Sequence, residues 1–254
     1  MNPPPNPENE AVWREVLTKR HPSRLAFLPS RPRCIACQTP FRGIGGLVAT
    51  FSKRKRSRKN PNFCNYCEDV LPPGGAVVDT VILFADIRGS TAMGEKANPE
   101  AFAATLNRFY AVVTEVLTRR VGMVDKLIGD EVMGLFIPSC GPTYRLDSMK
   151  AAEEIMRELR RPEAGTSGLS VGIAVHSGPA FVGRIGTHDI HDFTALGDTV
   201  NTCAKMQEEA AAGEILCSEK LYQLVSSEYP NAPQRALKLP GREQTLGVRV
   251  LRVP

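Results

Sequence analysis

The sequence lacks any apolar run long enough to cross a membrane. Its 254 residues are 42% hydrophobic and 23% charged, the proportions of an ordinary globular protein. Its longest apolar stretches fall well short of the roughly 20 residues that a transmembrane helix needs. The N-terminal stretch MNPPPNPENE also lacks the basic segment followed by an apolar segment that marks a secretory signal. These absences predict a cytoplasmic protein without a transmembrane segment.

Aromatic residues are scarce, at 6% of the chain, and none interrupts the basic segment SKRKRSRKN at 52–60. This segment carries six basic side chains in a protein whose net charge is +5. Such a segment can attract nucleic acid or an anionic membrane surface. Because it contains no aromatic side chain to stack on bases, a solvated loop is the favoured interpretation.

Without an export signal, the seven cysteines are expected to be thiols or metal ligands rather than disulfides. Four of them form two C-x-x-C pairs, Cys34 with Cys37 and Cys64 with Cys67. Two such pairs predict a tetrahedral site of four sulfur ligands, for which structural Zn²⁺ is the first choice. An iron–sulfur cluster and a redox-active dithiol remain alternatives.

Changes in composition divide the chain into four segments. Residues 1–32 are expected to form a tail with a short helix at 11–20, and 33–70 a zinc-binding module with four cysteine ligands. The LPPGG stretch supports a linker at 71–76. A catalytic domain is expected over 77–254, where strand and helix patterns alternate.

The pattern of the large domain predicts an α+β fold. A β-branched run at 77–86 indicates a buried strand, and helical spacing of apolar residues indicates helices at 98–120 and 144–160. KLIGDEVMGLFI at 126–137 has the alternation and Gly-Asp turn of a hairpin. A second hairpin is expected at 169–186, turning at Ser177-Gly178-Pro179.

The remaining elements complete a ferredoxin-like βαββαβ core sheet covered by helices. HDFTAL is expected to form a strand that leads into a helix at 198–211, and further strands are expected at 233–238 and 246–252. No internal repeat suggests a solenoid.

Polar residues gather at the ends of the first strand and the first hairpin. Asp86 and Asp130 would be carboxylates on adjacent strands, which suits hard cations such as Mg²⁺ or Mn²⁺. Gly89, Ser90 and Thr91 open the next segment, where backbone amides at a helix start can cradle a phosphate. Together these residues indicate phosphate chemistry that depends on divalent metals.

A further polar group follows the HDFTAL strand. In FTALGDTVNTCAKM, Asn201 and Lys205 are four residues apart and so share one face of the expected helix. Lys238 precedes a Pro-Gly turn. Alone, each of these residues is typical of a solvated surface.

In combination, the motifs resemble the class III nucleotidyl cyclases, the adenylate and guanylate cyclase catalytic domain. The resemblance covers roughly 77–254. It rests on four motifs in family order: FADIRGST, KLIGDEVMGLF, VGIAVHSGPAFVGRIG and FTALGDTVN. It implies the class III cyclase fold and conversion of a nucleoside triphosphate to a cyclic nucleotide and pyrophosphate.

The resemblance assigns a role to each matching position. It makes Asp86, Asp130 and the backbone carbonyl of Ile87 the ligands of two Mg²⁺ or Mn²⁺ ions per site. Lys126 matches the position that reads adenine N1, and Thr194 the partner of the adenine amino group in a bacterial-type subgroup. Guanine-reading relatives typically have Glu at the first position, because N1 of guanine carries a hydrogen. The implied substrate is therefore ATP, and guanylate cyclase activity is less favoured.

The resemblance also covers the sugar and phosphates, with one departure from the family pattern. Asn201 matches the residue that orients the ribose, and Lys238 matches the lysine that binds the outer phosphates. The family expects an arginine four residues after Asn201, where this chain has Lys205. Lysine lacks the planar fork that can support the transition state through two hydrogen bonds.

The family builds each site from two chains, so the resemblance implies a homodimer with two shared active sites. Lys205 keeps open an alternative, a cyclase-like dimer that binds nucleotide and regulates without turnover. A protein whose main role is binding nucleic acid through the basic module is a third possibility, less favoured than the other two.

Overall fold

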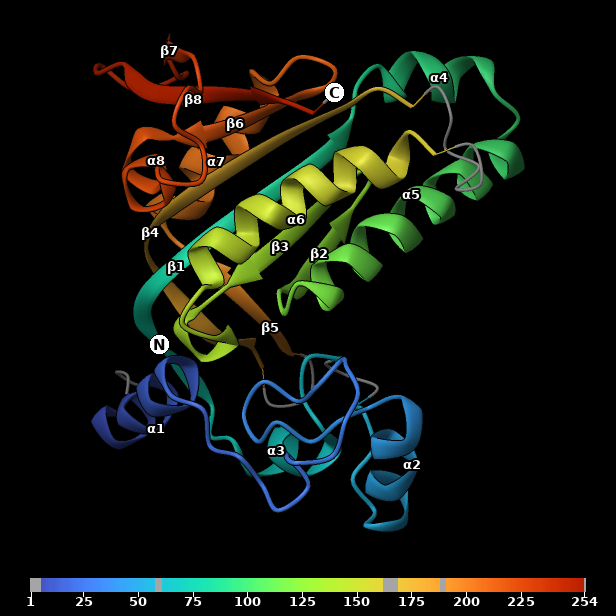
Figure 1. Cartoon of the computed structure of the whole chain (residues 1–254), viewed down its shortest axis with the longest axis vertical. Helices are drawn as coiled ribbons and strands as arrows, with labels where there is room; N and C mark the ends of the chain where they lie inside the picture. Colours follow the sequence, from blue (N-terminus) through green and yellow to red (C-terminus); the bar gives the residue numbers. More distant parts are fainter. Residues whose placement is uncertain (1–5, 58–60, 162–168, 188–190, 254) are drawn as a thin grey trace. The chain divides into compact units, whose positions relative to one another are not determined.

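The computed structural model describes residues 6–57, 61–161, 169–187 and 191–253 (Figure 1). The first five residues of the expected tail, and 58–60 of the basic segment, lie outside these ranges. The helices are α1 (Pro7–Thr18), α2 (Gly43–Phe51), α3 (Asn65–Val70), α4 (Ser90–Lys96), α5 (Pro99–Arg119), α6 (Tyr144–Leu159), α7 (Asp198–Glu208), α8 (Glu219–Val225) and the 3₁₀ turn η1 (Pro138–Cys140). The strands are β1 (Gly74–Ile87), β2 (Met123–Ile128), β3 (Glu131–Phe136), β4 (Val171–Gly186), β5 (His191–Leu196), β6 (Glu214–Ser218), β7 (Gln234–Leu237) and β8 (Leu246–Arg252).

The described residues divide into two compact units. Unit 1 takes its residues from 1–80, 137–144 and 179–197, and unit 2 from 81–136, 145–178 and 198–254. The strands β1 and β4 each contribute residues to both units.

Unit 2 contains a mixed sheet with the strand order β2-β3-β1-β4-β6-β8-β7. β1 pairs antiparallel with β3, which places Asp86 opposite Glu131, and β4 runs parallel to β6. The order β2-β3-β1-β4 is that of the expected ferredoxin-like core, and the α+β prediction is confirmed. The strand β6 and the helix α8 were not among the expected elements.

The helix α5 illustrates how the sequence sets an element of this unit. Asn98 caps its start by accepting a hydrogen bond from the Glu100 amide at 2.9 Å, and Pro99 occupies the first turn, where no amide partner is needed. One face of α5, including Phe109 and Val113, is buried. The helix therefore covers the sheet over β2 and β3 (Figure 1).

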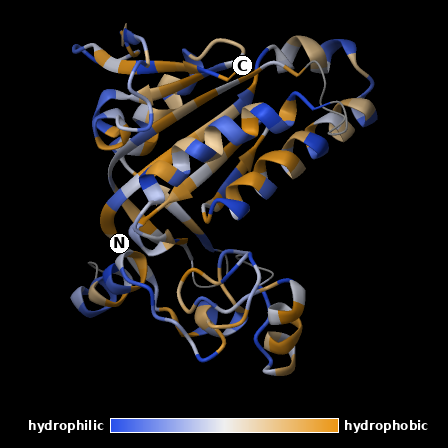
Figure 2. Ribbon diagram, viewed as in Figure 1, coloured by the Kyte–Doolittle hydropathy of each residue, from blue (hydrophilic) through white to orange (hydrophobic). Residues whose placement is uncertain are grey.

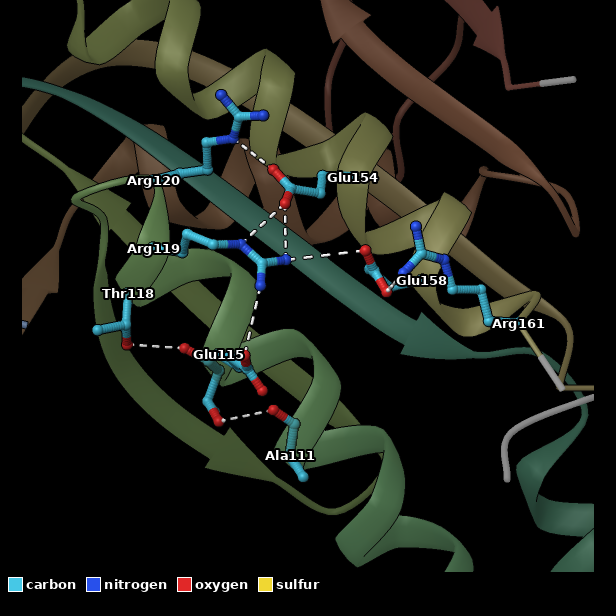
Figure 3. A network of polar contacts seen from close by, with 9 residues as sticks. Ala111, Glu115, Thr118, Arg119, Arg120, Glu154, Glu158 and Arg161 are labelled. Carbon is cyan, nitrogen blue, oxygen red and sulfur yellow. Dashed lines mark hydrogen bonds and ion pairs between the residues drawn. The ribbon is translucent and has the colours of Figure 1, made fainter. Parts of the chain in front are cut away.

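Charged side chains join the C-terminal end of α5 to α6 (Figure 3). Nη2 of Arg119 lies 2.6 Å from the Glu154 carboxylate, and Arg120 binds the other oxygen of the same group. Glu154 is only 13% exposed. Burial raises the pKa of Glu154, but hydrogen bonds from Arg120 and Arg119 outweigh burial, so its pKa is lowered. The carboxylate thus stays ionised between two helices.

The expected hairpin with its turn at Ser177-Gly178-Pro179 is wrong. These residues lie inside β4, which continues for 16 residues. Gly178 is needed there because α7 passes close by: a Cβ at this position would lie 2.6 Å from the Thr199 hydroxyl. A Ser-Gly-Pro sequence therefore marks a close backbone approach rather than a reversal. The actual hairpin in this region is β4–β5, paired from Phe181–Leu196 to Gly186–His191.

Unit 1 is built around Trp13 of α1, which is fully buried. Its ring stacks on Phe193 of β5 with 5.8 Å between centroids, and Phe63 meets it edge-on at 6.4 Å. Helix α1 begins earlier than predicted because Asn6 caps it and Pro7 fits its first turn. Among the described residues, no helix is both long and apolar enough to span a membrane.

Candidate active site and cysteine site

Two carboxylates meet where β1 ends beside the β2–β3 turn of unit 2. Asp86 occupies the penultimate position of β1, and Asp130 lies in the turn after Gly129, whose φ of +61° suits glycine. The Ile87 amide donates to the backbone oxygen of Asp130 at 3.3 Å. The structure thus brings together the three residues expected to hold divalent metal ions.

The electrostatics of this corner favour a cation. Burial raises the pKa of Asp86 to about 6, with Arg88 opposing and Asp130 adding to the rise. Burial, together with the charges of Asp86 and Asp130, raises the pKa of Glu131 to about 7. Several partly buried acids repel one another and bind protons more readily, unless a divalent cation compensates their charge. Oxygen donors of this kind fit Mg²⁺ or Mn²⁺.

Glu131 and Arg88 are parts of this site that sequence reasoning missed. Glu131 follows Asp130 directly, and pairing of β1 with β3 sets it opposite Asp86. Arg88 lies 3.8 Å from the Asp86 carboxylate and donates to the Gln207 backbone oxygen at 2.8 Å, near the end of α7. The signal for Glu131 was its place at the start of a strand that pairs with β1. No local pattern identifies Arg88.

A pocket of about 220 Å³ is lined in part by Asp130, one of the two carboxylates. It lies beside the start of α4, which follows Gly89 in a left-handed conformation with φ of +76°. Its lining residues come from α4, α5 and the β2–β3 turn: Ser90, Thr91, Gly94, Phe102, Leu106, Gly129 and Asp130. Two of the residues expected to contact phosphate therefore share a pocket with one expected metal ligand.

The two residues expected to read the base lie in different units. Lys126 is half-buried on β2 of unit 2, three residues before the Gly129 turn. Thr194 is 2% exposed on β5 of unit 1, paired with Gly183. Thr194 lies in the regular antiparallel register of β4 and β5. Lys126 pairs with Met133 directly after a register shift between Val124 and Lys126 in the β2–β3 pair.

The helix α7 carries the residues expected to act on the ribose and α-phosphate. Asn201 is exposed on this helix. Nζ of Lys205 donates to the Pro240 backbone oxygen at 2.6 Å, in the segment that also bears the exposed Lys238. The structure therefore places the two lysines expected to contact phosphates beside the same turn.

An arginine also reaches α7 near these lysines. Nη2 of Arg242 donates to the Thr202 hydroxyl at 2.6 Å and forms an ion pair with Asp198. Asp198 and Thr202, together with Asn201 and Lys205, follow the i, i+3, i+4, i+7 spacing of one helix stripe. A guanidinium is thus present on this stripe, although position 205 lacks one.

The four paired cysteines come together in unit 1. Sulfur atoms of Cys34, Cys37, Cys64 and Cys67 all lie within 4.8 Å of one another, and all four residues are buried. The Cys64 amide points at the Cys34 sulfur at 3.3 Å. Hydrogen bonding from Cys34 is the main cause that lowers the pKa of Cys37 and brings that of Cys64 to about 7. Arg54 lies 3.6 Å from the Cys37 sulfur. Hydrogen bonding with Cys37 raises the pKa of Cys34, and hydrogen bonding with Cys34 raises that of Cys67, so the four thiols share fewer than four protons. The Cys64 amide and the Arg54 guanidinium favour thiolates, the form that binds metal.

This cysteine site is tied to the β4–β5 hairpin by polar contacts as well as aromatic ones. Arg184 of β4 donates to the Leu71 backbone oxygen at 3.0 Å and to that of Glu68. Nε2 of His191 lies 3.9 Å from the Glu68 carboxylate, and both side chains are mostly buried. The helix α3, which contains Cys67, is therefore fixed to the strand pair that carries Thr194.

The fold is that of the nucleotidyl cyclases. Residues 76–250 match the family described as the adenylate and guanylate cyclase catalytic domain. The match extends over more than half of the chain, and the protein belongs to this family.

Individual relatives and solved structures agree with this assignment. An adenylate cyclase of Anabaena cylindrica is 34% identical over 133 residues, covering 50% of this chain and 26% of that protein. The terminal-differentiation-specific adenylate cyclase of Dictyostelium discoideum is 28% identical over 160 residues, covering 61% of this chain and 7% of its own length. The chain thus matches only a minor part of these relatives.

Solved cyclase structures share the fold. The guanylyl cyclase Cya2 superposes with a TM-score of 0.64 at 24% identity, covering 71% of this chain and 95% of its own. The adenylyl cyclase CyaB from P. aeruginosa superposes with a TM-score of 0.62 at 22% identity, covering 70% of this chain and 96% of its own. These similarities show the class III cyclase fold and do not distinguish adenine from guanine.

Proposed function

We propose that the protein is an adenylate cyclase that converts ATP to 3′,5′-cyclic AMP and pyrophosphate in intracellular signalling. The observation that carries the proposal is the meeting of Asp86 and Asp130 beside a pocket lined by Ser90 and Thr91. In this proposal 77–254 is the catalytic domain. It is preceded by the tail 1–32, the zinc module 33–70 and the linker 71–76, and the protein works in the cytoplasm.

Asp86, Asp130 and the Ile87 carbonyl would hold two Mg²⁺ or Mn²⁺ ions. Bound there, such ions would lower the pKa of the ribose 3′-hydroxyl and neutralise charge on the leaving pyrophosphate. A bond would form between O3′ and the α-phosphorus. The bond between the α-phosphorus and the oxygen that bridges it to the β-phosphorus would break, which releases pyrophosphate, and the hydroxyl proton would leave to solvent. Ser90 and Thr91, with the amide after Gly89, would bind the phosphate chain.

Other residues would orient the substrate. Lys126 would donate to adenine N1, with Thr194 binding the exocyclic amino group. Asn201 would position the ribose, while Lys205 would stabilise the α-phosphate and Lys238 the outer phosphates. A lysine donor at N1 favours adenine over guanine, because guanine presents a hydrogen at this position.

The site would be completed by a second copy of the chain. The family resemblance places the metal ligands of one protomer opposite Lys126, Thr194 and Asn201 of the other. A homodimer would then contain two equivalent sites, and an isolated monomer would be inactive.

Zn²⁺ is the proposed occupant of the cysteine site, with an iron–sulfur cluster as the alternative. Four converging, buried sulfur ligands fit a closed structural site. Visible absorption of the purified protein separates the two, because a cluster is coloured and zinc is not. Metal analysis should find one zinc per chain.

The direct test is a product assay. Purified protein is incubated with ATP or GTP and Mn²⁺, and cyclic nucleotides are measured by mass spectrometry. We expect cyclic AMP from ATP and little product from GTP. Asp86→Asn and Asp130→Asn, which remove the metal-binding charge, should abolish it while leaving the dimer folded.

A regulatory dimer without turnover is the second candidate, and Lys205 favours it. Its Nζ is already bonded to the Pro240 carbonyl, and it cannot provide the planar fork of an arginine. Saturable ATP binding by a folded dimer, with no cyclic product from either nucleotide, would support this candidate and overturn the enzyme proposal.

A further inference from the structure

The helix α2 turns its large apolar side chains outward. Three small residues of this helix, Gly45, Gly46 and Ala49, are buried against the rest of unit 1. Ile44, Leu47 and Phe51 are instead 73%, 61% and 82% exposed, and Val48 is also exposed. A helix of a globular protein normally buries its large apolar face, so this helix has the reverse orientation.

Close packing on the glycine side fixes this orientation. A Cβ at Gly45 would lie 2.2 Å from the Pro29 backbone oxygen, and one at Gly46 would lie 2.5 Å from the Phe41 carbonyl carbon. Only glycine permits such an approach, so α2 cannot rotate to bury Leu47 or Phe51 without losing this contact. The outward apolar face is therefore set by the packing of the module.

The four exposed apolar residues of α2, at 44, 47, 48 and 51, follow the spacing of one helix face. Figure 2 shows α2 mostly in the colour of hydrophobic residues. Phe27 is 82% exposed as well; it precedes Leu28, whose Cβ would lie 3.2 Å from a Cβ at Gly45. Single exposed apolar residues are common, but a helix face made of four of them marks an interaction surface.

The surrounding sequence carries charge of one sign. Between Glu15 and Glu68 the chain contains twelve lysine and arginine residues and no aspartate or glutamate. Arg42 directly precedes α2, and Lys53 and Lys55 follow its end; all three are exposed. An apolar helix face flanked by exposed cations is the pattern of segments that lie in the interface of an anionic membrane.

We propose that α2, with Arg42, Lys53 and Lys55, docks the protein on an anionic lipid bilayer. Ile44, Leu47 and Phe51 would enter the headgroup–acyl boundary while the cations contact lipid phosphates and carboxylates. Nucleic acid offers no apolar partner for the aliphatic side chains at the centre of this face. In a two-fold contact with a second copy, the same patch would face itself and bring like charges together.

Vesicle co-sedimentation of the full chain tests this surface without any nucleotide. One set of vesicles is pure phosphatidylcholine, and the other contains about 30% phosphatidylserine, a strongly anionic composition. We expect binding to the anionic vesicles, several-fold weaker binding to neutral ones, and a decrease with added salt. Because turnover is not measured, failure here is distinct from failure of the cyclase proposal.

Variants separate the apolar face from general charge attraction. The double substitution Leu47→Ser with Phe51→Ser should weaken binding to anionic vesicles at least about tenfold, since two large side chains lose their apolar environment. Leu224→Ser, at a 58% exposed position of α8, is the matched control and should leave binding unchanged. Lys53→Glu with Lys55→Glu should also weaken binding, whereas Lys19→Glu, just after α1, should have little effect.

Three results would overturn the proposal. The first is no sedimentation with anionic vesicles, or equal sedimentation of the Leu47/Phe51 double variant with unchanged metal content and Trp13 fluorescence. The second is a lower oligomeric state of that variant in ultracentrifugation without lipid, which would assign the face to a second copy. The third is that the same variant loses binding to RNA, measured in parallel, but keeps binding to vesicles, which would assign the face to nucleic acid.

Discussion

The ring of Phe63 packs edge-on against that of Phe193, with 4.9 Å between centroids and 85° between planes. Phe63 immediately precedes the cysteine-site residue Cys64, and Phe193 immediately precedes Thr194 on β5. Within unit 1, one aromatic contact thus connects the cysteine site to the strand proposed to read adenine. Loss of metal from the cysteine site should therefore disturb the packing of β5, and disruption of β5 should disturb the cysteine site.

Metal removal should be visible in the fluorescence of Trp13, the single tryptophan of the chain. Trp13 is fully buried between Phe63 and Phe193. Stripping the cysteine site with a chelator under reducing conditions should unfold the segment around it and admit water to the indole. We expect a red shift of the emission and stronger quenching by iodide, both reversed by added Zn²⁺.

The control for this measurement is Cys64→Ser, which should resemble the stripped protein before chelation and change little after it. Unchanged Trp13 emission in protein shown by elemental analysis to have lost its metal would contradict the coupling.

Glu154→Gln should destabilise unit 2, because it removes a charged partner from both Arg119 and Arg120. We expect a loss of about 1–3 kcal/mol in the free energy of unfolding at neutral pH, the usual cost of breaking a partly buried charged hydrogen bond. Glu115→Gln is the matched control, since Glu115 is 67% exposed and its ion pair with Arg119 should contribute little. Urea unfolding measures both.

The difference in unfolding free energy between wild type and Glu154→Gln should depend on pH. Because the folded-state pKa of Glu154 is lowered, its contribution is complete above the ordinary glutamate pKa and is lost as the pH falls through the lowered value. The difference between wild type and Glu154→Gln should shrink in acid. A difference that stays constant there would show that the lost stability is not electrostatic.

Lys126→Glu should change base preference. A carboxylate cannot donate to adenine N1 but can accept the hydrogen on guanine N1. We expect activity with ATP to fall about 100-fold or more, as for a lost polar contact to the discriminating group, and the GTP-to-ATP ratio of kcat/KM to rise. Lys150→Glu on α6 is the charge-reversal control. A ratio that does not move would remove Lys126 from base reading.

Lys205→Arg should raise kcat by at least about tenfold, if the missing guanidinium limits transition-state stabilisation. Arg242→Lys tests the competing explanation that Arg242, bonded to Thr202 on the same helix stripe, already provides that group. A higher kcat for Lys205→Arg and little change for Arg242→Lys would support the explanation that the missing guanidinium at position 205 limits turnover. The reverse pattern, with no gain at 205 and a large loss at 242, would assign the role to Arg242.

Much of unit 2 could be predicted because its signals are local. The Gly129–Asp130 turn and the β-branched run of β1 identify their elements without reference to distant residues. The turn expected at Ser177–Pro179 failed because the need for Gly178 comes from Thr199, on a helix that follows the next strand. Glycine is favoured both in a local turn and where another element packs closely, so its presence in the sequence does not distinguish the two.

The rest of the site depends on contacts that span the chain. The Phe63–Phe193 contact and the hydrogen bonds of Arg88 to α7 join residues more than a hundred positions apart. The outward face of α2 was equally hidden: no helix was expected at 43–51, and the packing of Gly45 against Pro29 is what turns its large apolar side chains outward. Local sequence patterns indicate apolar helix faces and turns, but they do not identify the distant residues that pack against them.

Complementation tests the central claim, cyclase activity at a site shared between two chains. Asp86→Asn lacks the metal site and Asn201→Ala the ribose contact, so each variant alone should form almost no cyclic AMP from ATP and Mn²⁺. If the sites are shared, an equal mixture after subunit exchange should recover about a quarter of wild-type activity, because half of the dimers are mixed and each has one intact site. No recovery with an active wild type, or no cyclic AMP from the wild type itself, would contradict the account.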